Sequence, residues 1–195
     1  MMILSETGNE KLVCSWSDGI TDKSANDFCD TANAVLMDHF DLDYMRRKYQ
    51  PNIYGSSLIA IIYKDDVPVA VEGAWRNDVN GRPAFQICDT ATLPSMRKRG
   101  YNTAIAKALI SEIKRVYPDA LVYRFSGPMS YRMAEHLGFA RTLRYARIYH
   151  GETLDFLENM PVIDDAYVDA FLLNKNDLFV KQSYRVGGGY SISAD

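Results

Sequence analysis

The segment from Thr90 to Ile113 constrains the fold of this chain more than any other, because a β-rich run passes through a basic loop directly into an amphipathic helix. Apolar residues recur there at helical spacing, so the helix has one apolar face and begins near Tyr101, just after Gly100. The first turn of a helix carries free backbone N–H groups and the positive end of the helix dipole, and both attract anions. The loop adds the positive charges of Arg97, Lys98 and Arg99. We therefore predict a pyrophosphate-binding site at this point.

The loop sequence excludes two known phosphate-binding motifs and matches a third. The run from Arg97 to Asn102 reads RKRGYN, which is neither the Walker-type GxxxxGK[ST] nor the dinucleotide-binding GxGxxG. It resembles the acyl-CoA loop of the GNAT N-acetyltransferase superfamily, whose pattern is Q/R-x-x-G-x-G/A after a strand that ends near a proline. Arg97, Gly100 and Pro94 match that pattern, and Asn102 replaces its last Gly or Ala.

A second block supports the resemblance. Residues 131–139 read YRMAEHLGF, which resembles the helix ending in Leu-Gly-Phe that these enzymes place after their fifth strand. The resemblance covers Lys11 to about His150. It implies a mixed α/β fold, with a central sheet of about seven strands flanked by helices, and acetyl-CoA as co-substrate. The residues expected at the acetyl-CoA site are Thr92, Leu93, Arg97, Lys98, Arg99, Gly100, Tyr101, Asn102, Thr103 and Ser126.

The activity that the resemblance implies is direct attack of an amine on the thioester in a ternary complex, which needs an oxyanion donor, a base and an acid. Backbone N–H groups around Thr92 and Leu93 are expected to be the oxyanion donors. Asp89 is the carboxylate of the predicted central strand, and we expect it either to act as the base or to bind a substrate cation or cap a loop. The tyrosine that commonly serves as the acid in the superfamily is replaced here by Ala134. The remaining candidates for the acid are Tyr131, Tyr145 and solvent.

The acceptor is expected to be a small-molecule primary amine. Residues 47–55 read RKYQPNIYG and are loosely similar to GNAT-like proteins of polysaccharide biosynthesis, which favours an amino sugar. Arg47, Tyr49 and Tyr54 are then the expected acceptor contacts, although the same run also fits a packed surface loop. Two alternatives stay open: a peptide or protein N-acetyltransferase, and a non-catalytic GNAT-fold binding or regulatory protein.

The composition narrows the class of partner. A net charge of −3 argues against a general nucleic-acid binder, which usually carries a basic excess. The sequence has no apolar run long enough to cross a membrane, and its N-terminus, MMILSETGNEK, does not resemble a signal peptide. We therefore expect a cytoplasmic protein without nucleic-acid or membrane partners. The oligomeric state is left open, with a homodimer as one option.

Neither the cysteines nor the histidines show a metal-binding pattern. Cys14, Cys29 and Cys88 fit reduced thiols, and Cys88 is interpreted as a small buried residue rather than a nucleophile, because no histidine partner is apparent. The polar cluster at residues 38–43 is interpreted as a helix end rather than a set of metal ligands. No metal is expected.

The predicted elements alternate along a single domain of residues 1–195. Within a core of about residues 11–150, the patterns predict strands at 11–16, 57–63, 67–75, 84–92, 121–126 and 141–150, and helices at 24–39, 101–117 and 129–137. Turns are expected at 65–66 and 77–82. The C-terminal region, residues 151–186, is expected to hold a helix at 164–173 and a last strand at 178–186, followed by a flexible tail at 187–195.

Overall fold

The computed structural model describes residues 2–36, 39–79, 82–126 and 130–139. These residues fall into two compact units. The first, residues 2–78 and 82–124, carries the sheet and three helices, and the second carries the short helix α4 (Tyr131–His136). The strands are β1 (Met2–Thr7), β2 (Glu10–Trp16), β3 (Leu58–Lys64), β4 (Val67–Val79), β5 (Arg82–Thr92) and β6 (Leu121–Arg124). The helices of the first unit are α1 (Asp22–Asn33), α2 (Leu42–Tyr49) and α3 (Tyr101–Val116), with short 3-10 turns at Ser17–Gly19 and Pro94–Met96.

The strands form one mixed sheet in sequence order, β1 to β6. Strands β1 to β4 pair antiparallel with their neighbours. The crossover through α3 makes β6 parallel to β5, and their pairing runs from Ala84↔Leu121 to Ile87↔Arg124. Strand β5 continues to Thr92, so its last five residues extend beyond the described pairing with β6.

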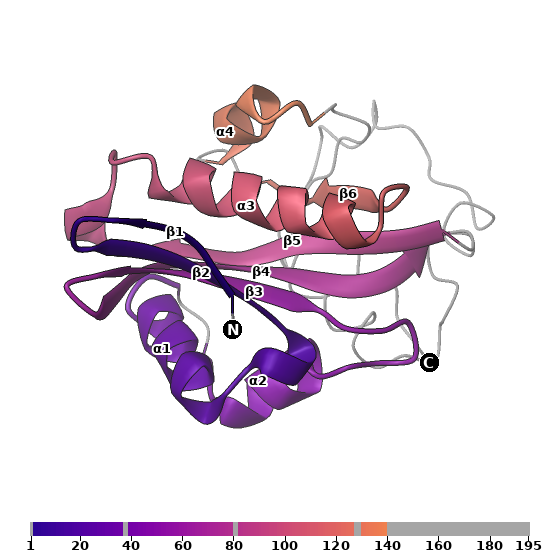
Figure 1. Cartoon of the computed structure of the whole chain (residues 1–195), viewed down its shortest axis with the longest axis horizontal. Coiled ribbons are helices and arrows are strands. Elements are labelled where there is room, and N and C mark those ends of the chain that lie inside the picture. Colours follow the sequence, from indigo (N-terminus) through magenta and orange to yellow (C-terminus); the bar gives the residue numbers. More distant parts are fainter. Residues whose placement is uncertain (1, 37–38, 80–81, 127–129, 140–195) are drawn as a thin grey trace, which may run out of the picture. The chain divides into compact units, whose positions relative to one another are not determined.

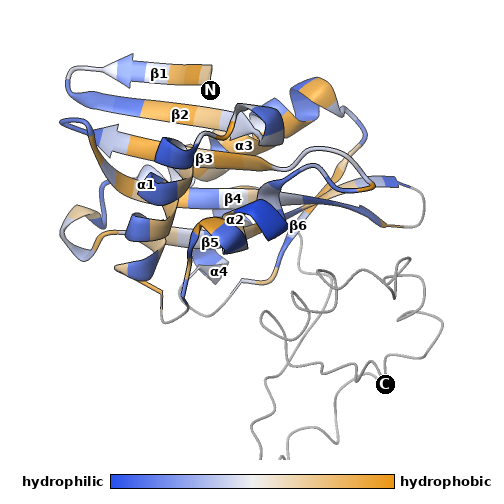
Figure 2. Ribbon diagram, turned by 90° about the horizontal axis from the view of Figure 1, so that it is seen from below, coloured by the Kyte–Doolittle hydropathy of each residue, from blue (hydrophilic) through white to orange (hydrophobic). Residues whose placement is uncertain are grey.

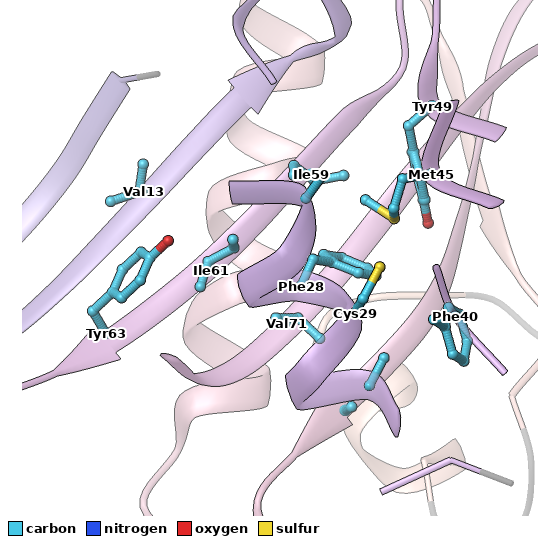
Figure 3. Close-up of a cluster of buried hydrophobic side chains, with 13 residues drawn as sticks. Val13, Phe28, Cys29, Phe40, Met45, Tyr49, Ile59, Ile61, Tyr63 and Val71 are labelled. Atoms are coloured by element: carbon cyan, nitrogen blue, oxygen red, sulfur yellow. The ribbon is translucent and has the colours of Figure 1, made fainter. Parts of the chain in front are cut away.

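Helices cover both faces of this sheet: α1 and α2 lie on one face and α3 lies on the other (Figure 1). Phe28 of α1 and Tyr49 of α2 are fully buried and pack in one core cluster with Ile59 and Val71 of the central strands (Figure 3). Aromatic rings fill one end of the α3 face, in contacts between Trp16, Phe85 and Tyr117 at centroid distances of 5.5 to 6.1 Å. The core is therefore divided by the sheet into two layers.

Both helices of the first layer begin at side-chain caps. Thr21 and Ser24 bond to each other's backbone N–H groups at the start of α1, and Asp41 accepts from the Tyr44 N–H at 2.6 Å at the start of α2. The polar cluster at residues 38–43 therefore includes a helix start. Among the described residues no group of three or more potential ligands could hold a metal ion.

The structure confirms the mixed α/β class and corrects several predicted boundaries. The helix predicted at 24–39 ends at Asn33, because the Asn33 side chain bonds both the N–H and the carbonyl of Phe40 at 2.8 Å. Helix α2 was not predicted, and neither was β1, whose residues are all exposed and which lies at the edge of the sheet (Figure 2). The turn predicted at 77–82 is shorter, because Asn77 is buried within β4 and donates to the Tyr123 hydroxyl at 2.6 Å.

The other predicted elements of the first unit are present with small shifts at their ends. The predicted turn at 65–66 is formed by two aspartates with left-handed backbone, at φ 50° and 61°. Strand β6 ends two residues before the predicted position, and α4 is described over 131–136 rather than 129–137. The elements predicted at 141–150, 164–173 and 178–186, and the tail at 187–195, lie outside the described residues. Within the described part of the chain, no helix is both long and apolar enough to cross a membrane.

Candidate functional site

The basic loop enters α3 through two residues with left-handed backbone. Lys98 has φ 63°, and Gly100, which is the N-cap of α3, has φ 83°. No side chain among the described residues caps α3, so the first-turn N–H groups of Tyr101, Asn102 and Thr103 keep their capacity to bind an anion. Because the loop cations are exposed beside this helix start, the arrangement fits the phosphates of a bound ligand.

The side chains of two residues in this loop region form hydrogen bonds with the sheet. Tyr101 is buried, and its hydroxyl bonds Oε1 of Glu10 on β2, so Tyr101 offers a ligand only its backbone N–H. Arg97 is exposed, and its Nε donates to the Thr92 carbonyl at 3.4 Å. The guanidinium of Arg97 is thereby held next to the end of β5, while Lys98 and Arg99 extend from the loop surface.

Beyond Ile87, the edge of β5 on the β6 side has no strand pairing among the described residues, and this edge of residues 88–92 is called the free edge below. The Leu93 N–H donates to the Val69 carbonyl of β4 at 3.0 Å, which corrects the expectation that Leu93 supplies an oxyanion donor. Because successive N–H groups of a strand point to opposite sides, the Thr92 N–H points away from β4, toward the edge that lies beyond the β6 pairing. The Thr92 hydroxyl is buried and has no hydrogen-bond partner among the described residues.

Asp89 belongs to the stretch of β5 that extends beyond the described β6 pairing, and it has an unusual left-handed backbone at φ 52°. Its carboxylate accepts three hydrogen bonds from α2: Lys48 Nζ at 2.9 Å, the Tyr44 hydroxyl at 3.1 Å and the Tyr49 hydroxyl at 2.6 Å. Lys48 and Asp89 form a buried ion pair with side chains 7% and 12% exposed. Both carboxylate oxygens are therefore occupied by the protein's own donors, so the cation that Asp89 binds is Lys48 and the base role is disfavoured.

The ionisation of this cluster follows from its burial. Burial alone would lower the pKa of Lys48, but the negative charge of Asp89, the electrostatic effects of Cys88 and Tyr44 and the hydrogen bond to Asp89 together raise the pKa well above its usual value. Burial and the Asp89 charge both raise the pKa of Tyr49, so its hydroxyl stays a donor. Burial also raises the pKa of the Cys88 thiol to about 11, in spite of the nearby Lys48 charge. A neutral thiol at physiological pH agrees with the interpretation of Cys88 as a packed residue and not a nucleophile.

A missing side chain on β4 makes room for this cluster. A Cβ atom on Gly73 would lie 1.8 Å from the Tyr49 hydroxyl oxygen, so only glycine lets Tyr49 reach Asp89 across the sheet. Tyr49 is fully buried, which assigns it to holding Asp89 rather than to acceptor contact.

The other predicted acceptor and acid residues are not members of this cluster. Arg47 is exposed on α2, and Tyr54 is part of the turn whose Asn52 side chain donates to the Arg76 carbonyl at 2.8 Å. Tyr131 lies on α4 of the second unit, where Ala134 is buried, and Ser126 also belongs to that unit. Tyr145 lies outside the described residues.

One carboxylate of the sheet was missed by the sequence reasoning, which considered only the strand that carries Asp89. Glu72 of β4 is fully buried, and its Oε1 accepts from the Thr90 hydroxyl at 2.5 Å and lies 3.6 Å from Arg124 Nη1. Burial raises the pKa of Glu72 to about 7, although the Arg124 charge and the Thr90 hydrogen bond lower it. The available signal was a single acidic residue inside the apolar run VPVAVEGAW.

Comparison with known proteins gives a likeness in structure only. No family model matches the sequence, and no curated protein is similar to it in sequence. Among solved structures, the chain is similar to an aminoglycoside N-acetyltransferase in complex with CoA, with 17% identity and a TM-score of 0.56 over 76% of this chain and 99% of that one. It is also similar to glucosamine-6-phosphate N-acetyltransferase from Arabidopsis thaliana, with 16% identity and a TM-score of 0.55 over 73% of this chain and 99% of that one.

A third similar structure is an acetyltransferase from Trypanosoma brucei, with 19% identity and a TM-score of 0.54 over 71% of this chain and 99% of that one. The three proteins share the acetyltransferase designation, and each is matched over nearly its whole length. This chain therefore has the fold of the GNAT acetyltransferases, as the acyl-CoA loop and the Leu-Gly-Phe helix predicted.

Proposed function

We propose that the protein is an acyl-CoA-dependent N-acetyltransferase that transfers an acetyl group from acetyl-CoA to the primary amine of a small molecule, by direct attack in a ternary complex. The observation that carries the proposal is the β5–loop–α3 segment, where an uncapped helix start, three exposed cations and the free edge of β5 adjoin one another. The likeness to an acetyltransferase in complex with CoA supports it.

Different residues of the first unit are proposed to bind different parts of acetyl-CoA. Arg97, Lys98 and Arg99 would hold the pyrophosphate together with the first-turn N–H groups of α3. When bound, acetyl-CoA would supply an acetyl group already activated as a thioester. The backbone N–H of Thr92 would stabilise the developing oxyanion, and one such donor contributes roughly 3 kcal/mol. Tyr131, Tyr145 and solvent remain the proposed sources of a proton for the departing thiolate.

An amino sugar is the proposed acceptor. Two of the similar structures are enzymes named for amino-sugar-containing acceptors, glucosamine-6-phosphate and aminoglycosides, and the sequence at residues 47–55 favours the same class. Arg47 and Tyr54 stay the proposed acceptor contacts, because Tyr49 is committed to Asp89. A cytoplasmic location also stays a prediction from the sequence.

The alternative that a specific observation favours is a GNAT-fold binding protein without turnover. The position of the usual acid is Ala134, and Asp89, the first candidate for the base, is bonded to Lys48, Tyr44 and Tyr49. Such a protein would bind acetyl-CoA and transfer nothing.

Calorimetric titration with acetyl-CoA tests the binding step. The double variant Arg97→Ala, Arg99→Ala should bind at least tenfold more weakly than the wild type. A matched control removes two exposed positive charges elsewhere, with Arg46→Ala and Lys107→Ala, and should bind as the wild type does. Absence of wild-type binding would refute the acetyl-CoA site. A larger loss of acetyl-CoA affinity in the control variant than in Arg97→Ala, Arg99→Ala would refute the location of the site.

A free-thiol assay on a panel of amines tests the transfer step. With amino sugars as acceptors, the protein should release CoA thiol faster than with amino-acid amides or short peptides at the same concentration. Binding without release for every amine would favour the non-catalytic alternative, and faster release with peptides would favour a peptide acetyltransferase.

A further inference from the structure

Resting on the acetyltransferase function proposed above, we propose that Glu72 takes up the proton of the attacking amine through the hydroxyl of Thr90. This assigns the base to β4, where the sequence reasoning had placed none. Thr90 is the residue that would touch the reacting amine, and Glu72 is the proton store behind it.

The two faces of the sheet separate this pair from the Asp89 cluster. Gly73 faces Tyr49 and α2, so its neighbour Glu72 points to the opposite face, the one covered by α3. Likewise Asp89 bonds to α2, while the next residue on β5, Thr90, bonds to Glu72. Asp89 and Thr90 are consecutive residues of one strand, so their side chains point to opposite faces and reach different partners.

The hydrogen bonds around Glu72 are incomplete in a way that suits a proton acceptor. Glu72 is fully buried, and the partners that the described residues supply are both at its Oε1, the Thr90 hydroxyl at 2.5 Å and Arg124 at 3.6 Å. Its Oε2 is buried and has no hydrogen-bond partner among the described residues. Buried carboxylates that serve only structure normally have both oxygens bonded, so an uncompensated oxygen points to a functional use.

Thr90 lies where the reaction is proposed to take place. It belongs to the part of β5 beyond the last pair with β6, Ile87↔Arg124, and it is two residues before Thr92, whose N–H points to the same free edge. Thr90 is partly exposed while Glu72 is fully buried, so Thr90 is the member of the pair that a ligand at this edge can contact. A relay through Thr90 is therefore the direct path between the free edge and Glu72.

The charge on Glu72 can change near neutral pH. Opposite it on β3 is the apolar Ala60, on β5 it meets the neutral Thr90, and on β6 it faces the positive Arg124. Burial outweighs the Arg124 charge and raises the pKa of Glu72 to about 7. A base is most effective when its pKa is close to the working pH.

The step balances as follows in atoms and electrons. As the N–C bond forms and the C–S bond breaks, one amine proton passes to Oγ1 of Thr90 while the Thr90 hydroxyl proton passes to Oε1 of Glu72. The electron pair of the broken C–S bond leaves on sulfur. Glu72 is then neutral and later releases its proton to solvent through Thr90, while the CoA thiolate takes a proton from one of the sources proposed above, Tyr131, Tyr145 or solvent.

Three variants test the relay in steady-state acetyl transfer with the best amine of the panel. Glu72→Gln should lower kcat by about 10²- to 10⁴-fold, which is the usual contribution of a general base, and should leave acetyl-CoA affinity within about twofold. Thr90→Val should lower kcat comparably, whereas Thr90→Ser, which keeps the hydroxyl, should retain most of it. The wild-type rate should rise with pH through about 7, and Glu72→Gln should lose this dependence.

The controls separate the relay from a merely structural role. A structural role predicts that acetyl-CoA affinity and kcat fall together and that the pH profile keeps its shape. If Glu72→Gln and Thr90→Val both transfer acetyl with the kcat of the wild type, the relay is overturned and the proposed function still stands. Acetyl-CoA binding without transfer by the wild type would overturn the proposed function and the relay with it. Carbon-13 NMR should show the Glu72 carboxyl titrating near 7, and a midpoint near 4 would also overturn the relay.

Discussion

Replacing Lys48 with methionine should destabilise the protein by about 3 kcal/mol, because it removes one partner of the buried Lys48–Asp89 ion pair. The side chains are 7% and 12% exposed and their charged atoms lie 2.8 Å apart, so solvent cannot replace the lost partner. Breaking such a pair from one side costs about 3–5 kcal/mol. The lower end applies here because the Tyr44 and Tyr49 hydroxyls still donate to Oδ2 of Asp89.

Urea unfolding followed by the fluorescence of the two tryptophans measures this effect. With a slope of about 2 kcal/mol/M, the midpoint of Lys48→Met should fall by about 1.5 M. The pKa of Lys48 is raised, so the stability that its charge contributes is complete below the unfolded value of about 10.4 and is lost only as the pH rises through the higher folded value. The difference from wild type should therefore be constant between about pH 6 and 9.

A double-mutant cycle with Asp89→Asn isolates the pair. The double variant should lose less stability than the sum of the single variants, with a coupling energy of about 2 kcal/mol or more. Lys107→Met on the exposed face of α3 is the matched control and should change stability by less than about 0.5 kcal/mol. A coupling energy near zero, or a Lys48→Met loss no larger than that control, would refute the ion pair as the device that fixes Asp89.

Three further predictions concern stability and ligand binding. The folded pKa of Glu72 is raised from about 4.5 to about 7, so the stability that its protonated form contributes should be complete below about pH 4.5 and fall by about 3 kcal/mol as the pH rises to 7. Urea titrations at pH 5 and 8 should show this loss in the wild type and a much smaller one in Glu72→Gln. An unchanged pH dependence in the variant would contradict the assignment. Gly73→Ala should cost about 1–3 kcal/mol in thermal unfolding, because its Cβ would lie 1.8 Å from the Tyr49 hydroxyl, and a neutral substitution would show that Tyr49 does not reach Asp89 this way. Tyr101→Phe should lose the bond to Glu10 at a cost of about 1 kcal/mol while acetyl-CoA affinity stays the same, whereas weaker binding would mean that the hydroxyl contacts the ligand.

The sequence predicted features that depend on neighbouring residues. The basic loop and α3 were located to within one residue at each end, since helical spacing and Gly100 act over a few positions. Strand β3 and the aspartate turn were predicted for the same reason. Helix α2 was missed because its charged sequence, LDYMRRKY, has a narrow apolar face that only the packing of Met45 and Tyr49 on the sheet reveals.

The roles of the acidic residues were decided only by the tertiary structure. The sequence placed Asp89 on a central strand, but its partners Tyr44, Lys48 and Tyr49 lie 40 to 45 positions earlier and meet it only when α2 packs on the sheet. Glu72 and Thr90 are 18 positions apart and meet because β4 and β5 are neighbours. Local sequence thus determined that a strand leads through a basic loop into an amphipathic helix, whereas burial and contacts between distant strands and helices decided which carboxylate is held as an ion pair and which is proposed to accept a proton.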